Sequence, residues 1–349
     1  MKVKKRQRRT MKTNYSKAKR LWEEAEVHDY IIAPKELSVK LKNNFELEIQ
    51  FEGQEHELTG YLKEQFLRKL KMPLSFFKYL CSTVPSTFFN EDDLQELVLH
   101  LLHERKRDLK ISTIDFDKSK PKLWRIVSPN FSYLKDNEIL EIVEKNINGP
   151  VTPKVRVFSL ERCSYEFLFP ETKVQIDGDE ATTGLYLITS NAGLSSIKLK
   201  GYVHILTGDN KHIGLIEQIQ NEFSFFRRTH YMKDTEKWKS LLSLYVKGAI
   251  ENCRKVSRRL VESITRAKEI EIEDEKKFVE DFRKFFKLPK KFLADKELSS
   301  LWDVVKEISI ASEDPVEREE LQTVAARAAS WDVDFINAIV CGGEKVVKM

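Results

Sequence analysis

The chain has 349 residues, of which 41% are hydrophobic, so it can bury a sizeable core in one large domain or two ordinary ones. No apolar run approaches the roughly 18 residues that a membrane span needs, and no apolar signal stretch follows the basic start, so we expect a cytoplasmic protein without a membrane partner. The formal net charge is only +5, because 60 Lys and Arg face 55 Asp and Glu, and the distribution of charge is therefore more informative than its total.

The segment at residues 1–14 contains many bases and no acid. Such a block repels itself, which predicts a disordered arm. The arm either contacts phosphates or only keeps the chain in solution. Its bases are Lys2, Lys4, Lys5, Arg6, Arg8, Arg9 and Lys12.

Residues 15–233 have the pattern of an α+β core. Helical spacing over 15–30 is followed by alternating strands at 37–41 and 45–51, a return strand after Gly53, and helices near 59, after Pro73 and after Asn90. Residues 109–230 are rich in β-branched and aromatic residues. We expect strands there at 109–116, 123–128, 155–160, 165–169, 184–189, 195–205 and 223–228, with a helix at 137–145.

Helical spacing returns after Asp234. It predicts one long helix over 237–270 and further helices over 275–286, 299–310 and 317–340. The expected fold is therefore α+β, with a central mixed or antiparallel sheet flanked by helices and a helical C-terminal region over 234–349.

The four cysteines are far apart in the sequence, at Cys81, Cys163, Cys253 and Cys341. Without a CxxC pair, neither a zinc site nor a redox motif is indicated. We expect free thiols in a reducing compartment, and neither a metal nor a cofactor.

Two stretches resemble a family of phage and plasmid proteins called domain of unknown function 932. The first, "FLRKLKMPLSFFKYL" with "LWRIVSPNFSYLKDNEIL", matches the family through Arg125, Ser128, Tyr133, Asp136 and Asn137. The second, "GLYLITSNAGLSSIKLKGYVHI", does so through Gly184, Ser190, Gly193 and Ser196, and "FFRRTH" is similar to its closing element. "TSNAG" departs from the family's "NSExG", and its "C-x-N-G" is missing. The resemblance covers residues 60–230 and implies a mobile-element context near replication and recombination, without a known reaction.

Four groups of residues combine bases with aromatic side chains or with helical spacing. The first lies on a predicted strand, where an Arg beside an aromatic residue can bind phosphate and stack a base. Alternatively, Arg125 pairs with Asp115 or Asp136 to hold a turn. The members of this group are Lys120, Lys122, Trp124 and Arg125.

The second and third groups belong to the β-rich region. Lys198 and Lys200 alternate with Ile197 and Leu199, which predicts one basic and one buried sheet face, or else a plain solvated face. The third group interleaves aromatics and bases as single-strand binding requires, unless the phenylalanines are core and the arginines cap a strand. Its members are Phe225, Phe226, Arg227, Arg228 and His230.

The fourth group is a basic stripe on the long helix. Its spacing places the bases on one side, where they either contact phosphates or pair with Glu251, Glu262 and Glu269. The stripe consists of Arg254, Lys255, Arg258 and Arg259.

Enzyme motifs for nucleotide or acyl chemistry are absent from the sequence. His100 and His103 lack a zinc-site context, and the acidic turn at Asp177, Asp179 and Glu180 is read as a hairpin rather than a cation site. We therefore expect a non-enzymatic nucleic-acid-binding protein of a mobile element, most concretely a homo-oligomer, with a ring as one form, that binds and anneals single-stranded DNA in a basic groove. A phage or plasmid assembly factor and a metal-dependent nuclease with scattered carboxylates are the alternatives.

Overall fold

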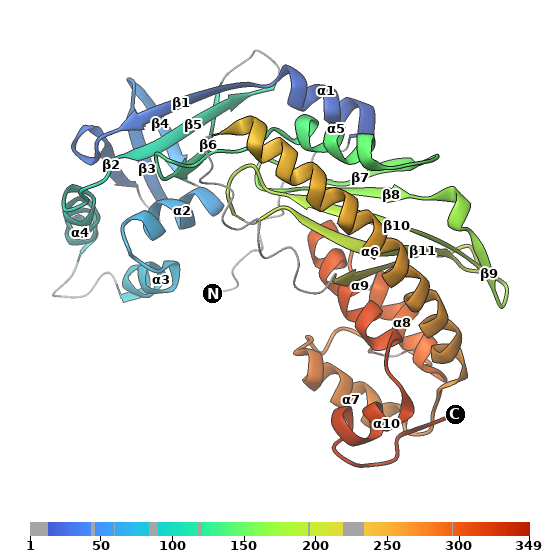
Figure 1. Ribbon diagram of the computed structural model, residues 1–349. Helices are drawn as coiled ribbons and strands as arrows, with labels where there is room; N and C mark the ends of the chain where they lie inside the picture. The colour runs from blue at the N-terminus through green and yellow to red at the C-terminus, as the bar shows by residue number, and fades with distance from the viewer. Residues whose placement is uncertain are drawn as a thin grey trace.

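The computed structural model describes residues 13–42, 46–58, 60–83, 90–116, 121–194, 196–218, 234–294 and 296–349 (Figure 1). The chain is α+β, with antiparallel sheets and a helical C-terminal region, as the sequence predicts. The basic segment 1–12 and the predicted strand at 223–228 lie outside the described residues.

The N-terminal part contains two small antiparallel sheets, ordered β1-β5-β6 and β2-β3-β4, with helices beside them. Asn14 caps the first helix by accepting a hydrogen bond from the Lys17 amide. The elements are α1 (Tyr15–Glu24), β1 (Glu26–Ile32), β2 (Ser38–Lys42), β3 (Glu46–Phe51), β4 (Gln54–Leu58), α2 (Tyr61–Lys69), α3 (Leu74–Thr83), α4 (Glu91–His103), β5 (Leu109–Asp115) and β6 (Lys122–Val127).

The predicted helix over 15–30 is wrong in its second half, which is strand β1. This strand pairs with β5 along its whole length, from Glu26 opposite Asp115 to Ile32 opposite Leu109. The partner lies more than seventy residues away in the sequence. Helical spacing, a local signal, was therefore overridden by tertiary pairing.

A larger curled sheet forms the middle of the molecule, with strand order β12-β11-β10-β8-β7 and β9 paired to β10. Helices α1, α5 and α6 lie over one of its faces (Figure 1). Gly201 of β11 allows α6 to approach, since a Cβ there would lie 3.1 Å from Val256. The elements are α5 (Asp136–Asn146), β7 (Thr152–Phe158), β8 (Cys163–Leu168), β9 (Val174–Ile176), β10 (Asp179–Thr189), β11 (Lys198–Leu206) and β12 (His212–Gln218).

The C-terminal region begins with the long predicted helix, α6 (Thr235–Glu269), which Asp234 caps. The predicted helix over 317–340 is interrupted, because Asp332 caps a new short helix by accepting a hydrogen bond from the Phe335 amide. The elements that follow α6 are β13 (Glu271–Ile272), α7 (Glu275–Phe286), α8 (Leu301–Ile310), α9 (Pro315–Ala329), α10 (Val333–Phe335), a π-helical turn (Ile336–Val340) and β14 (Val347–Lys348).

Helix α6 contributes to two hydrophobic cores. Its first half, from Trp238 to Cys253, packs with Trp22, Trp124 and Tyr165. Its second half, from Leu260 onward, packs with the inner faces of α7, α8 and α9 and with β11 and β12. The helical C-terminal region therefore shares its apolar interior with the sheet.

Candidate functional site

The predicted basic groups do not all lie at the surface. Lys122 is exposed at the start of β6. Lys120 and the whole third group, Phe225, Phe226, Arg227, Arg228 and His230, lie outside the described residues. The other members fall at three separate places in the fold.

Trp124 and Arg125 are buried, each with 0% of its surface exposed. In the described structure neither side chain is accessible to a phosphate or a base, so their predicted contact with nucleic acid has no exposed surface to form on. The Arg125 guanidinium donates hydrogen bonds to Ser112 Oγ at 2.9 Å and to Asp29 Oδ1 at 3.2 Å, and it lies 3.7 Å from the ring centre of Tyr133. The alternative of an ion pair was right in kind, but the partner is Asp29 rather than Asp115 or Asp136.

The two stretches that resemble a known family meet in space at Asn191. Arg125 Nη1 donates to the carbonyl oxygen of Asn191 at 3.0 Å, and the Asn191 side chain donates to Asp136 at 2.7 Å. Tyr165 and Thr189 also donate to Asp136, each at 2.7 Å, while burial raises the pKa of this carboxyl group. These motif residues form a buried junction between β6, α5 and the larger sheet, and their role in the described structure is to hold these elements together.

Lys198 and Lys200 line a cleft between the larger sheet and α9. Their strand alternates as predicted, because Ile197 and Leu199 are buried on the opposite face while Lys198 is exposed and Lys200 is half-buried. The cleft has a volume of about 300 Å³. Its charged lining consists of Arg162, Lys198, Lys200, Glu161, Glu319 and Glu320, so it is mixed rather than uniformly basic.

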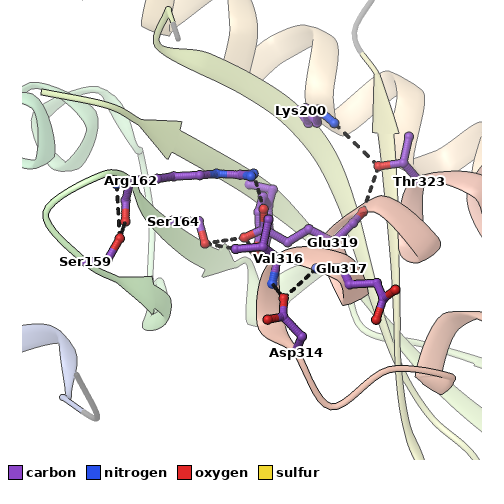
Figure 2. A network of polar contacts seen from close by, with 10 residues as sticks. Ser159, Arg162, Ser164, Lys200, Asp314, Val316, Glu317, Glu319 and Thr323 are labelled. Atoms are coloured by element: carbon purple, nitrogen blue, oxygen red, sulfur yellow. Dashed lines mark hydrogen bonds and ion pairs between the residues drawn. The ribbon is translucent and has the colours of Figure 1, made fainter. Parts of the chain in front are cut away.

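Glu319 is the centre of a polar network beneath this cleft (Figure 2). Only 5% of the residue is exposed, and its carboxylate forms an ion pair with Arg162 and accepts hydrogen bonds from Ser164 and, at 2.6 Å, from Tyr186. Burial and the nearby Glu319 charge raise the pKa of the Tyr186 hydroxyl well above its usual value. These hydrogen bonds and the ion pair offset part of the cost of burying the carboxylate, while Arg162 Nε is buried without a partner among the described residues.

The start of α9 sets the position of Glu319. Pro315 is its first residue, and the Asp314 side chain accepts hydrogen bonds from the amides of Val316 and Glu317, both at 2.9 Å (Figure 2). Sequence reasoning missed Arg162 and Glu319, which are 157 residues apart. No local spacing connects them.

Lys200 is the most perturbed base of the cleft. Its Nζ lies 3.5 Å from Thr323 Oγ1, and burial together with the neighbouring Lys198 lowers its pKa to about 8. A lysine with such a pKa is partly neutral at mildly alkaline pH. The amine can then exchange a proton or attack an electrophile, whereas a fully charged surface lysine only attracts anions.

The basic stripe of α6 lies on the outside of the molecule. Arg254 is half-buried. Its guanidinium forms an ion pair with Glu171 at 3.4 Å and lies over the ring of Phe169, 4.9 Å from the ring centre. Lys255, Arg258 and Arg259 are exposed, and no described acid lies within ion-pair distance of them. The expected alternative, pairing of the stripe with Glu251, Glu262 and Glu269, is therefore not found among the described residues.

A shallow groove of about 470 Å³ runs along one side of this stripe. Arg254 and Arg258 line it from α6, and Thr172, Lys173 and Val174 line it from the sheet side. Glu171 and Glu262 also reach it. Arg258 is therefore the stripe residue that is best placed to bind an anion held in the groove.

Two of the three candidate metal residues of the acidic turn form ion pairs with lysines. In the acidic turn, Asp179 pairs with Lys268 at 2.9 Å and Glu180 pairs with Lys173 at 2.6 Å. Across the part of the chain that the structure describes, no group of three or more His, Cys, Asp or Glu side chains is arranged to hold a metal ion. None of the four cysteines, all of them in the described part of the chain, forms a disulfide.

Among the described helices, none has the combined length and apolar character that crossing a bilayer requires. Comparison with protein-family models, with curated proteins and with solved structures found no match to this chain, so its resemblance to domain of unknown function 932 stays a prediction.

Proposed function

We propose that the protein binds nucleic acid, with single-stranded DNA as the favoured ligand, through the exposed stripe of α6. The observation that carries this proposal is that Lys255, Arg258 and Arg259 are exposed, close together and without an acidic partner among the described residues. Lys and Arg side chains that neutralise phosphates supply most of the affinity of proteins that bind DNA without reading its sequence.

The position of the stripe supports a contact that follows the backbone of a strand. The 35-residue helix is held against the sheet by two cores, so its cations keep a fixed spacing. Lys247 and Arg266 extend the exposed bases along the same side, over about 28 Å at 1.5 Å per residue. Glu251, Glu262 and Glu269 share this side, which makes the stripe moderately rather than strongly basic.

Annealing by a homo-oligomer remains the most concrete form of the proposal. Annealing requires that strands be held by their phosphates while the bases stay free to pair, and this needs no covalent chemistry. An oligomer would repeat the α6 stripe along a strand. Four cysteines without a disulfide in the described structure are compatible with a reducing cytoplasm.

The alternative of an assembly factor would need an apolar stripe of the C-terminal helices that is free to contact a partner. In the described structure that stripe is used internally, because Phe278, Phe282 and Trp302 pack into a core. The alternative of a nuclease predicts cleavage of labelled DNA in the presence of Mg²⁺ or Mn²⁺. That incubation is the direct test of it.

The proposal is tested by fluorescence anisotropy with a labelled thymidine oligonucleotide over a series of salt concentrations. We expect the triple variant Lys255→Glu, Arg258→Glu and Arg259→Glu to bind much more weakly, with a salt slope smaller by about 2, since each single-strand phosphate contact contributes about 0.7. A matched control reverses three exposed bases elsewhere, Lys35, Lys106 and Arg107, which have no acidic partner among the described residues.

Unchanged binding by the α6 variant, or equal loss in the control, would overturn the assignment to α6. A wild-type protein without affinity at low salt would overturn nucleic-acid binding itself. Native mass spectrometry with and without the oligonucleotide then gives the oligomer number directly.

A further inference from the structure

A second basic groove lies in the C-terminal region, away from every residue group singled out in the sequence. It has a volume of about 960 Å³ and is formed by α7 and the segment that follows it. Six bases and two acids line it, together with a few apolar residues. The lining residues are Glu275, Lys276, Val279, Glu280, Arg283, Lys284, Lys287, Leu288, Lys290, Leu293, Ala294 and Lys296.

Four of these six bases have no acidic partner among the described residues, and one of the four, Arg283, donates a hydrogen bond to the carbonyl oxygen of Phe292 at 2.6 Å. Lys284 pairs with Glu280 at 2.9 Å and Lys296 with Glu307 at 2.9 Å. Lys276, Lys287 and Lys290 are exposed, and no described acid lies within ion-pair distance of them. Their charges are therefore available to an anion in the groove.

Two of these lysines lie at the ends of α7, and each has one feature that is unfavourable for the fold. Lys276 is in the first turn of α7, where the helix dipole disfavours a cation. Lys287 ends α7 in a left-handed conformation, with φ of 56°, where Gly would be less strained. A cation at the C-terminal end of α7 is favoured by the helix dipole, so the charge of Lys287 helps the helix and only its backbone conformation is strained. Lys276 is therefore the one of these two bases whose charge local stability does not explain, which favours a role for its side chain.

The floor of the groove is apolar while its rim is basic. Val279 and Leu293 are buried, at 7% and 6% exposed, and Leu288 and Ala294 lie beside them. A ligand that matches this pattern has several negative charges joined to an apolar part. Small-molecule and cofactor pockets measure about 300–1,000 Å³, so the groove is large enough for a ligand of this kind.

We infer that this groove binds a nucleotide unit through its phosphates, with Lys276, Lys287 and Lys290 as the phosphate-contacting bases. The nucleotide is either free or part of a single strand, and the shared chemistry is a polyphosphate or phosphodiester group beside a base. The site is distinct from the α6 stripe and does not depend on it.

An anionic membrane surface is less well matched to α7. A helix that lies on a bilayer needs its apolar face for the acyl chains. The apolar side of α7 is already used, because Phe278 and Phe282 are fully buried and Phe282 contacts Trp331 with 5.7 Å between ring centres. The lysines therefore stand at the rim of a groove rather than beside a free apolar face.

Isothermal titration of the full chain with three probes tests the inference: inorganic triphosphate, ATP, and a 5′-phosphorylated thymidine hexanucleotide. We expect ATP or the hexanucleotide to bind, and the variant Lys276→Gln, Lys287→Gln, Lys290→Gln to bind roughly 10- to 100-fold more weakly. The control variant Lys35→Gln, Lys106→Gln, Arg107→Gln should bind like the wild type, and circular dichroism should show all three proteins folded alike.

The outcomes separate this groove from the proposed function. Binding of ATP that persists in the α6 variant, with no binding of long single strands, supports the groove and contradicts the proposed function. Binding of long strands without binding of any of the three probes supports the proposed function and contradicts the groove. Equal binding by the groove variant and the wild type overturns the inference. Binding of phosphatidylserine vesicles in a parallel titration, without binding of any of the three probes, overturns it as well.

Discussion

Replacing Arg125 with Met tests whether this residue serves the fold or a ligand. The change removes hydrogen bonds to Ser112, to Asn191 and to Asp29, and it leaves the Asn191 carbonyl oxygen without its buried donor. Breaking a buried ion pair by removing one partner costs about 3–5 kcal/mol. The lower end applies, because the Asp29 side chain is 34% exposed and keeps Lys110 at 3.2 Å.

A loss of about 3 kcal/mol corresponds to a fall in Tm of about 4 °C, from an unfolding entropy of about 2.1 cal/mol/K per residue over the whole chain. Differential scanning calorimetry measures this shift, and DNA binding is measured on the same samples below the transition. Lys122→Met on the same strand is the control, since it is exposed and should change stability by less than about 0.5 kcal/mol.

The reasoning is refuted if Arg125→Met has the same Tm as the wild type but loses DNA affinity. That result would mean that Arg125 reaches a ligand from a conformation different from the one described. Arg125→Lys should recover little stability, because an ammonium group cannot reproduce the planar contact with Tyr133 and the three separate hydrogen bonds.

Two glycines and two lysines provide further predictions. Gly184→Ala should lower the midpoint of urea unfolding, because the new Cβ would lie 2.2 Å from the Phe167 carbonyl oxygen. Gly248→Ala should stabilise the protein by up to about 1 kcal/mol, because Gly248 is at an exposed position of α6 with nothing within 4 Å of the new Cβ. Midpoints that move in the same direction would contradict this. The pKa of Lys200 is lowered to about 8, so its acetylation rate should level off above that pH. The pKa of Lys211 is raised by its hydrogen bond to Asp209, so its acetylation rate should still be rising there. Peptide mass spectrometry at several pH values measures both rates, and identical profiles would show that burial does not perturb Lys200.

Local patterns in the sequence predicted much of the fold. The helix over 237–270, the return strand after Gly53 and the alternation around Lys198 all depend on spacing within one element, and each is found. Strand β1 was assigned to a helix because its partner β5 is distant. Strand β12 was not predicted, although its pairing with β11 builds one edge of the large sheet.

The site was harder to predict, for a different reason. A base in a sequence carries no sign of whether it will be exposed, and Arg125 and Lys255 look alike until burial separates them. The Glu319 network joins residues from three distant segments. The groove beside α7 was missed because its lysines follow no helical period beyond Pro289, so they resemble an ordinary solvated run.

The position of α6 also determines when the protein can finish folding during synthesis. The last described strand of the large sheet ends at Gln218, but the helix that covers its apolar face is translated afterwards, from Thr235 to Glu269. Until then, the growing chain carries an uncovered apolar sheet surface, the kind of exposed state that favours aggregation. A release of the nascent chain before α6 is made would leave both cores open, so truncations that end near residue 234 should yield insoluble protein rather than a stable N-terminal fragment.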